Sequence, residues 1–202
     1  MSFHRKDSWT CWWIAASAIL LLAGPCSRLA AAQKPKSGEA AGGSLIVGTV
    51  ASERGTTAAI PLYYEPSKNS HLRSVHLELD FVSNSIKFTK AEKGVASEVQ
   101  NFDVAVEAKE LPPDDKKISH TRLLIDVTLT DADARKSLPE GLLSFLNFKI
   151  PDDAKPFSIG LNPITVAAQD AAKKPVEVAA EAGKVIVSIP DAPLAGCFFF
   201  SH

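Results

Sequence analysis

The sequence predicts an all-β protein built as a single antiparallel β-sandwich of about nine strands. Short segments rich in β-branched and aromatic residues follow one another from residue 45 to residue 190. Several of them alternate apolar and polar residues, which is the period of a strand with one buried face. Clusters of Pro, Gly, Asp and Ser separate them, and no helical segments alternate with strands as a parallel sheet would require. Two sheets that pack face to face would bury one side of every strand.

The first 44 residues are expected to lie outside the sandwich. Arg5 and Lys6 precede an apolar run at residues 11–23, which is too short to span a bilayer as a mature helix. Small residues before position 33 suit a signal peptidase, so residues 1–32 are predicted to be a signal peptide cut after Ala32. The glycine-rich residues 33–44 predict a flexible linker. We therefore expect a secreted protein, located outside the cell or in a bacterial cell envelope (periplasm or outer surface).

Residues 45–190 are assigned to the sandwich. The clearest strand is "LRSVHLELDFV" at residues 72–82, because its apolar and polar residues alternate without a break. Turn-forming clusters separate the strands, and the only helical pattern is the short residue 131–138 segment. The remaining strands are expected at residues 45–51, 56–65, 85–92, 99–108, 122–130, 142–150, 157–168 and 184–189.

Charge and cysteine content exclude several classes of function. Removal of the signal peptide leaves 19 Lys and Arg against 22 Asp and Glu, which is no footprint for nucleic acid. Only Cys197 then remains, so the domain has no internal disulfide.

The paired aspartates at residues 114–115 and 152–153 lie in turn-like stretches beside lysines, where Asp commonly forms local hydrogen bonds. No nucleophile elbow, P-loop, HExxH or CxxC motif is present, and we expect no enzyme activity and no cofactor.

Three polar residues on the 72–82 strand deserve a separate test as metal ligands. His76, Glu78 and Asp80 are spaced two apart and therefore share one face of the strand. They could hold a zinc or calcium ion only if other strands supplied further ligands. The preferred interpretation is a solvated sheet face, and no metal site is predicted.

The ordered segments together resemble a cohesin domain. Cohesins are jelly-roll β-sandwich modules that bind dockerins in bacterial polysaccharide-degrading assemblies. The resemblance covers residues 45–189: a Val-Gly strand, a glycine turn and a strand with a central proline open the domain, and a closing hairpin and final strand complete it. The segments that carry it are "IVGTVASERGTTAAIPLYYE", "LRSVHLELDFVSNSIKFTKAEKG", "LPEGLLSFLNFKIPDDA" and "ITVAAQDAAKKPVEVAAEAGKVIVS".

This resemblance implies where a partner would bind. In cohesins the dockerin docks on the sheet that contains strands three, five, six and eight. "SVHLELDF" matches strand three and "SHTRLLIDVTLT" matches strand six, so the outward residues of both would face the partner. An outward leucine among charges is the apolar anchor with a polar rim that a small protein interface needs, although single surface leucines are also common. The implied partner-binding residues are His76, Glu78, Asp80, Arg122, Leu124 and Asp126.

The expected function is therefore a secreted, non-catalytic binding module. Its partner would be a dockerin-like protein in an extracellular or envelope assembly linked to polysaccharide breakdown. One alternative is a carbohydrate-binding module, for which Tyr63, Tyr64 and Phe102 are the candidate stacking residues. Because Tyr63 and Tyr64 are adjacent, one of them should face outward. A second alternative is a structural protein of the cell envelope or of secretion.

Residues 191–202 form a tail of unusual composition. Cys197 precedes three consecutive phenylalanines, Phe198–Phe200, and Pro190 and Pro193 interrupt strand pairing just before them. We expect Gly196–His202 to be an attachment or assembly signal in which Cys197 forms a covalent or disulfide link, and membrane contact is considered only through this tail. The alternative is that the phenylalanines fold back into a groove of their own sandwich.

Overall fold

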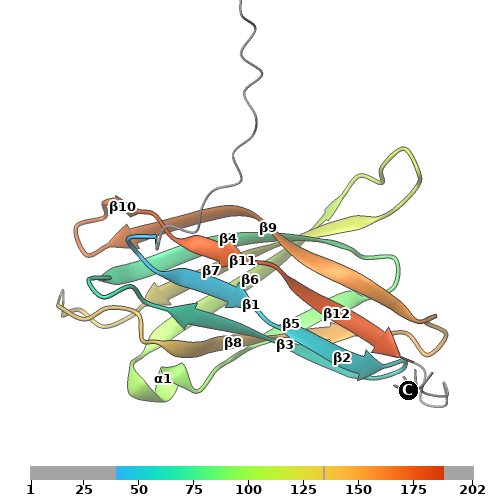
Figure 1. Cartoon of the computed structure of the whole chain (residues 1–202), viewed down its shortest axis with the longest axis horizontal. Coiled ribbons are helices and arrows are strands. Elements are labelled where there is room, and N and C mark those ends of the chain that lie inside the picture. The colour runs from blue at the N-terminus through green and yellow to red at the C-terminus, as the bar shows by residue number, and fades with distance from the viewer. Residues whose placement is uncertain (1–39, 134, 189–202) are drawn as a thin grey trace, which may run out of the picture. The chain divides into compact units, whose positions relative to one another are not determined.

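Two β-sheets pack face to face in the computed structural model, which describes residues 40–133 and 135–188 (Figure 1). The first sheet has the strand order β11-β1-β3-β8-β5, and the second has the order β2-β12-β9-β4-β7-β6, with β10 paired to β9. The predicted β-sandwich is therefore confirmed. The strands are β1 (Ser44–Val47), β2 (Thr49–Glu53), β3 (Thr57–Glu65), β4 (Leu72–Val82), β5 (Lys87–Lys93), β6 (Phe102–Leu111), β7 (His120–Leu129), β8 (Gly141–Lys149), β9 (Phe157–Asp170), β10 (Pro175–Val176), β11 (Ala179–Glu181) and β12 (Gly183–Ser188).

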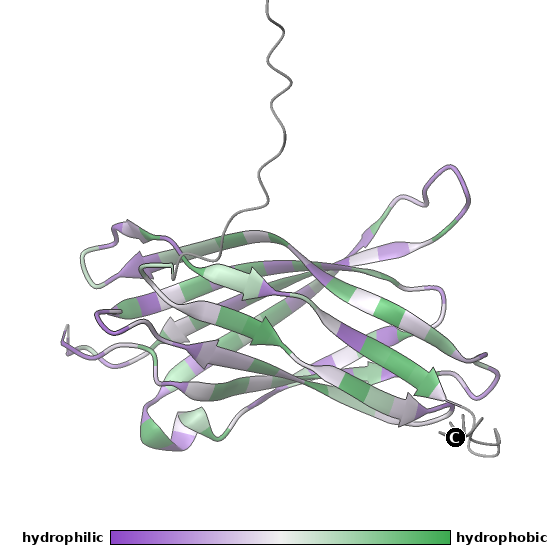
Figure 2. Cartoon of the chain, in the orientation of Figure 1, coloured by the Kyte–Doolittle hydropathy of each residue, from purple (hydrophilic) through white to green (hydrophobic). Residues whose placement is uncertain are grey.

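The core lies between the sheets and is filled by the apolar residues that alternate along each strand. Figure 2 shows this alternation as hydrophobic and hydrophilic bands that follow one another along the strands. Every second residue of β4 from Val75 to Phe81 is buried, and the residues between them are only partly buried. Phe81 meets Phe148 of the opposite sheet edge to face, with ring centroids 5.3 Å apart. Strand alternation thus fixes which side chains remain on the outer face.

Near the start of the domain the chain crosses from one sheet to the other. Residues 45–51 were expected to form one strand, but Gly48 separates β1 in the first sheet from β2 in the second. A Cβ at Gly48 would lie 2.5 Å from the Pro61 ring, so only glycine allows this close approach. β1 pairs parallel with β11, and β2 pairs parallel with β12, whereas the other strand pairs are antiparallel.

The predicted helical turn at residues 131–138 is wrong. The side chain of Asp131 accepts a hydrogen bond from the backbone N–H of Asp133, and Asp133 does the same for Arg135. These local bonds satisfy the backbone in a turn rather than in a helix. The helix of the described residues is α1 (Ala96–Val99), which precedes the strand expected at residues 99–108 and overlaps it only at Val99.

The boundary of the domain also differs from the predicted linker. Ala40–Gly43, assigned to the linker, belong to the sandwich: the Gly42 N–H donates to the Glu177 carbonyl at 2.8 Å. The predicted signal peptide, residues 33–39 of the linker, and the tail with Cys197 lie outside the described residues. Within the part of the chain that is described, no helix has the length and apolar character needed to cross a membrane.

Candidate functional site

The outer face of β4 and β7 brings all six predicted site residues together. Antiparallel pairing places His76 opposite Asp126, Glu78 opposite Leu124, and Asp80 opposite Arg122. Their neighbours along both strands point inward and are buried, so these six point outward. We call this set, His76, Glu78, Asp80, Arg122, Leu124 and Asp126, the β4–β7 patch.

Ion pairs connect the charged members of the β4–β7 patch into one network. His76 Nδ1 lies 2.7 Å from Asp126 Oδ1, and its Nε2 lies 3.6 Å from Glu78 Oε1. Arg122 Nη1 lies 3.2 Å from Glu78 Oε2. The same guanidinium donates from Nε and Nη2 to the two oxygens of Asp80, at 2.7 and 3.0 Å. This two-point contact fixes the plane of the guanidinium, so the charges are held in defined positions.

The network raises the pKa of its two nitrogen bases. The hydrogen bond to Asp126 raises the pKa of His76, with burial opposing and the Glu78 carboxylate reinforcing that effect. The hydrogen bond to Asp80 raises the pKa of Arg122 above its already high value. The patch holds three carboxylates against one guanidinium and His76, so it carries excess negative charge, and the excess is larger when His76 is neutral.

Leu124 supplies the apolar member of the patch. It is half-buried, and in register it lies between Glu78 of β4 and Glu107 of β6. A leucine bordered by carboxylates on both neighbouring strands can bury apolar area against a partner while the charges form a polar rim. The arrangement suits recognition of a surface that offers an apolar group beside basic groups.

Ile164 on β9 is an apolar residue of this face that the sequence reasoning missed. It is 53% exposed and lies where the β4–β9 register shifts between Glu78 and Leu79. Such an irregularity inserts an extra residue into one strand and re-aims its side chain. Pro163 in "LNPITV" was the available signal, because proline within a strand is often found at such irregularities.

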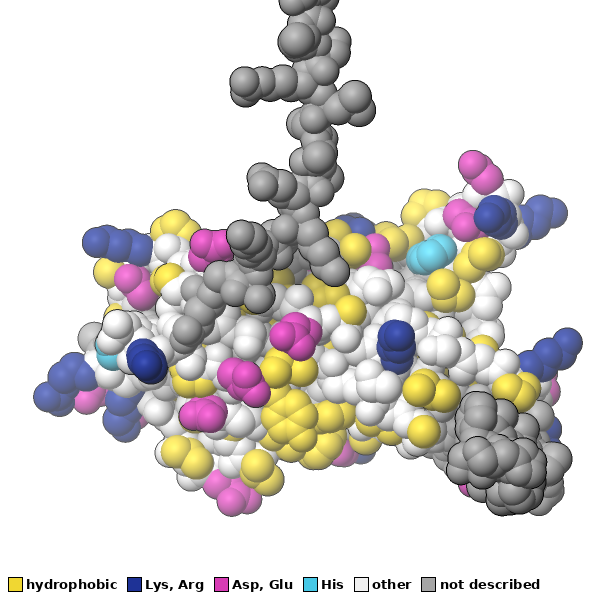
Figure 3. Space-filling model, in the orientation of Figure 1, with side chains coloured by type: hydrophobic (Ala, Val, Ile, Leu, Met, Phe, Trp, Pro, Cys, Tyr) yellow, Lys and Arg dark blue, Asp and Glu magenta, His cyan; other side chains and the backbone are white. Residues whose placement is uncertain are grey.

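The three sugar-stacking candidates occupy different environments. Tyr63 is 39% exposed and Tyr64 is 1% exposed, which confirms that one of the two tyrosines faces outward. Phe102 is fully buried, so its assignment as a stacking candidate is wrong. Figure 3 shows hydrophobic side chains close together over β3 and β8 on the side that it displays. Tyr63 of β3 belongs to that sheet, which is not the sheet of the β4–β7 patch.

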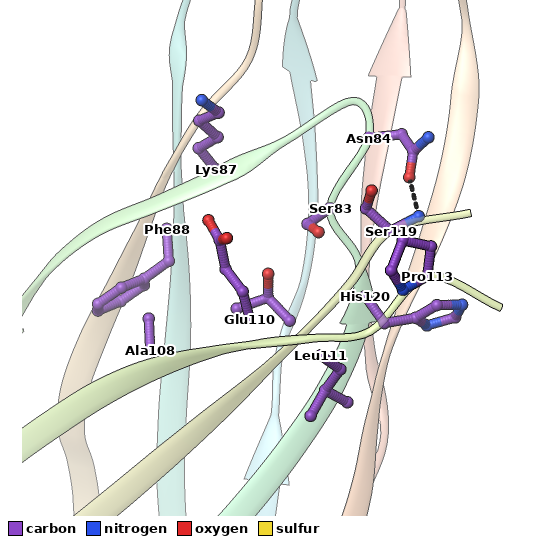
Figure 4. A pocket seen from close by; sticks show the side chains of 11 residues that line it. Ser83, Asn84, Lys87, Phe88, Ala108, Glu110, Leu111, Pro113, Ser119 and His120 are labelled. Atoms are coloured by element: carbon purple, nitrogen blue, oxygen red, sulfur yellow. Dashed lines mark hydrogen bonds between the residues drawn. The ribbon is translucent and has the colours of Figure 1, made fainter. Parts of the chain in front are cut away.

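The pocket in Figure 4 does not include the charged network. It lies between the β4–β5 turn and the β6–β7 hairpin, and Lys87, Glu110 and His120 line it together with several hydroxyl groups. Asn84 accepts a hydrogen bond from the Ser119 N–H at 2.6 Å and so ties the two loops together. Within residues 40–133 and 135–188, no three His, Cys, Asp or Glu side chains converge as metal ligands.

Comparisons with solved structures identify the fold as cohesin-like. A cohesin of the scaffoldin ScaC from Acetivibrio cellulolyticus, solved with a ScaB dockerin, has a TM-score of 0.55 at 15% identity, covering 71% of this chain and 97% of the other. A Clostridium acetobutylicum cohesin in complex with a dockerin has a TM-score of 0.54 at 19% identity, covering 72% and 99%. A non-cellulosomal cohesin from the archaeon Archaeoglobus fulgidus has a TM-score of 0.53 at 14% identity, covering 73% and 92%. No family model and no curated protein matches the sequence.

Proposed function

We propose that this protein is a non-catalytic module that binds another protein through the β4–β7 patch. The observation that carries the proposal is the ion-pair network, which holds His76 and four charged side chains around Leu124 on the outer face of β4 and β7. Side chains already held in place lose less conformational entropy on binding than free ones do. A partner therefore meets a preorganised surface.

The fold and the charge of the patch support one class of partner. Several of the cohesins similar in fold were solved in complexes with dockerins. The excess of carboxylates favours a partner that presents Lys or Arg, because complementary charge sets orientation and speeds encounter. A dockerin-like protein with a basic docking surface is the partner that we propose, in an exported assembly linked to polysaccharide breakdown.

The ionisable groups of the patch are paired with one another, which supports binding rather than catalysis. Asp80 is occupied by two hydrogen bonds from Arg122, and His76 lies between two carboxylates. A general base needs a free position within hydrogen-bond reach of a substrate proton. Groups that are already paired with one another on an open sheet face do not offer it.

A substitution at Leu124 tests the proposal. Immobilised dockerin modules should retain the mature chain, and Leu124→Asp should weaken retention at least tenfold, because it puts a charge at the apolar centre of the interface. Ile186→Asp is the matched control, since Ile186 lies on the outer face of the same sheet, on β12, and is 39% exposed. The proposal would be rejected if polysaccharide retained the chain and dockerin modules did not, and if Leu124→Asp left the retention on polysaccharide unchanged.

Carbohydrate binding is the second candidate, and one observation favours it. The exposed ring of Tyr63 lies on β3 opposite the sheet that carries the patch, and a sugar could stack on it. With Tyr64 and Phe102 buried, the other two candidates are not available for stacking. Loss of polysaccharide retention on Tyr63→Ala would favour this function over the protein partner.

A further inference from the structure

An apolar hollow opens where β4 and β9 separate. The two strands are paired as far as Asp80 and Asn162. Beyond that point β9 pairs with β12, from Leu161 to Phe157, while β4 continues along β7 to Val82. The space between the diverging strands, of about 640 Å³, is the β4–β9 hollow, and its lining includes Val82, Phe157, Ile159, Asn162, Ile164 and Lys155. Its volume is within the range of about 300–1,000 Å³ that is usual for ligand sites.

The lining leaves apolar surface uncovered. Ile164 is 53% exposed, and Phe157 and Val82 are only partly buried. Two further hollows offer a smaller share of apolar surface: Lys87 and Glu110 line the pocket in Figure 4, and Arg73, Asp170 and Lys173 line one at the opposite end of β4. Of these three hollows, the β4–β9 hollow is the one best suited to an apolar occupant.

The last described strand ends beside this hollow. β12 ends at Ser188, and the preceding residue, Val187, pairs with Phe157 of the lining. Phe198 follows Ser188 by ten residues, which span about 33 Å when extended. Ile164 lies seven residues beyond Phe157 along β9, or about 23 Å. The phenylalanines are therefore within reach of the whole hollow.

We propose that Phe198–Phe200 occupy the β4–β9 hollow, so that the tail folds back as part of its own domain. Three consecutive phenylalanines carry more apolar surface than a tail can favourably expose to water, and the hollow offers uncovered Ile164 and Phe157 against which to bury it. Pro190 and Pro193 lack the N–H that strand pairing needs, so the sequence disfavours a simple continuation of β12. The hollow shares Asp80 with the β4–β7 patch, but the proposal needs no partner protein.

Cys197, the residue before Phe198, provides the test. In the mature chain, Asn162→Cys places a second thiol on the lining, and Glu53→Cys places one on β2, next to Ser188 but on the side of β12 away from β9. Copper(II)–phenanthroline with dissolved oxygen takes two electrons from the two thiols, whose protons go to water, and an S–S bond forms. The docked tail should give an intramolecular disulfide at least tenfold faster with Asn162→Cys than with Glu53→Cys, measured on non-reducing gels and by mass spectrometry.

Three further variants keep the test decisive. Ile164→Cys repeats the measurement at a second lining position in case Asn162→Cys does not fold. Replacing all three phenylalanines by serine should abolish the rate difference, and deleting residues 196–202 should lower the melting temperature by several degrees. Equal rates at the two engineered thiols, or a melting temperature that the deletion does not change, would overturn the proposal and favour the attachment role instead.

Discussion

His76 is the residue of the patch whose charge responds to pH near neutrality. Its pKa is raised by the hydrogen bond to Asp126, with Glu78 adding to the effect. A raised folded-state pKa stabilises the fold fully below the unfolded value of about 6.5, and this stabilisation is lost as the pH rises through the folded-state pKa. The wild-type protein should therefore have a higher free energy of unfolding than His76→Gln, and the difference should be larger at pH 6 than at pH 8.5.

Urea unfolding of both proteins at the two pH values measures this difference. An NMR titration should place the pKa of His76 above 6.5, and Asp126→Asn should lower it, because that substitution removes the carboxylate that accepts the hydrogen bond. A stability difference between wild type and His76→Gln that is equal at the two pH values would contradict the network.

Much of the patch could be predicted at the level of single residues. The alternation along residues 72–82 and 122–130 shows which side chains face outward, whatever lies opposite. The alignment of His76 with Asp126 could not be predicted in the same way. It depends on the register between β4 and β7. These two strands are separated in the sequence by β5, α1 and β6, so no short turn fixes how their residues align.

Tyr64 connects two parts of the fold, because it ties residues 40–43, here called the entry segment, to β3. Its hydroxyl donates to the Gly42 carbonyl at 2.7 Å and lies 2.6 Å from Ser70 Oγ. Tyr64→Phe should cost about 1–2 kcal/mol of unfolding free energy, since it leaves buried polar groups with one partner fewer. Ser70 also donates to the Gly42 carbonyl, which keeps the loss moderate.

The adjacent tyrosine is the matched control for this prediction. Tyr63→Phe should change the unfolding free energy by less than about 0.5 kcal/mol, because the Tyr63 side chain is exposed. Urea unfolding compares the two variants. Equal losses in both would show that the contact with Gly42 does not hold the entry segment.

Element boundaries were predictable where turn residues mark them. The clusters at residues 66–70 and 151–156 lie between strands, as expected, and the cluster at residues 111–117 does so apart from Leu111, which ends β6. The break at Gly48 was not predictable, because its cause is the approach of the Pro61 ring from another strand. Asp131 and Asp133 resemble an acidic helix start in sequence, but Arg73 donates to the carbonyls of both residues and holds the segment as a turn.

At the scale of the whole molecule, the order of the segments carried more information than any one of them. Each strand pattern fits many β-sandwiches, whereas their succession resembles a cohesin, and the solved structures similar to the chain are cohesins. The parallel edge pairs of β1 with β11 and β2 with β12 escaped prediction. They join segments from the two ends of the domain, and nothing in either segment specifies the direction of its partner.

The central claim is that a protein partner binds the outer face of β4 and β7. The most direct measurement follows the backbone amide signals of the isotope-labelled mature chain by NMR. The chain is titrated with those dockerin modules that retain it in the immobilised form. We expect the shifted amides to cluster in β4 and β7 around His76 and Leu124, and the shifts to disappear in Leu124→Asp. Shifts confined to β3 and β8 around Tyr63, with β4 and β7 unchanged, would contradict the claim.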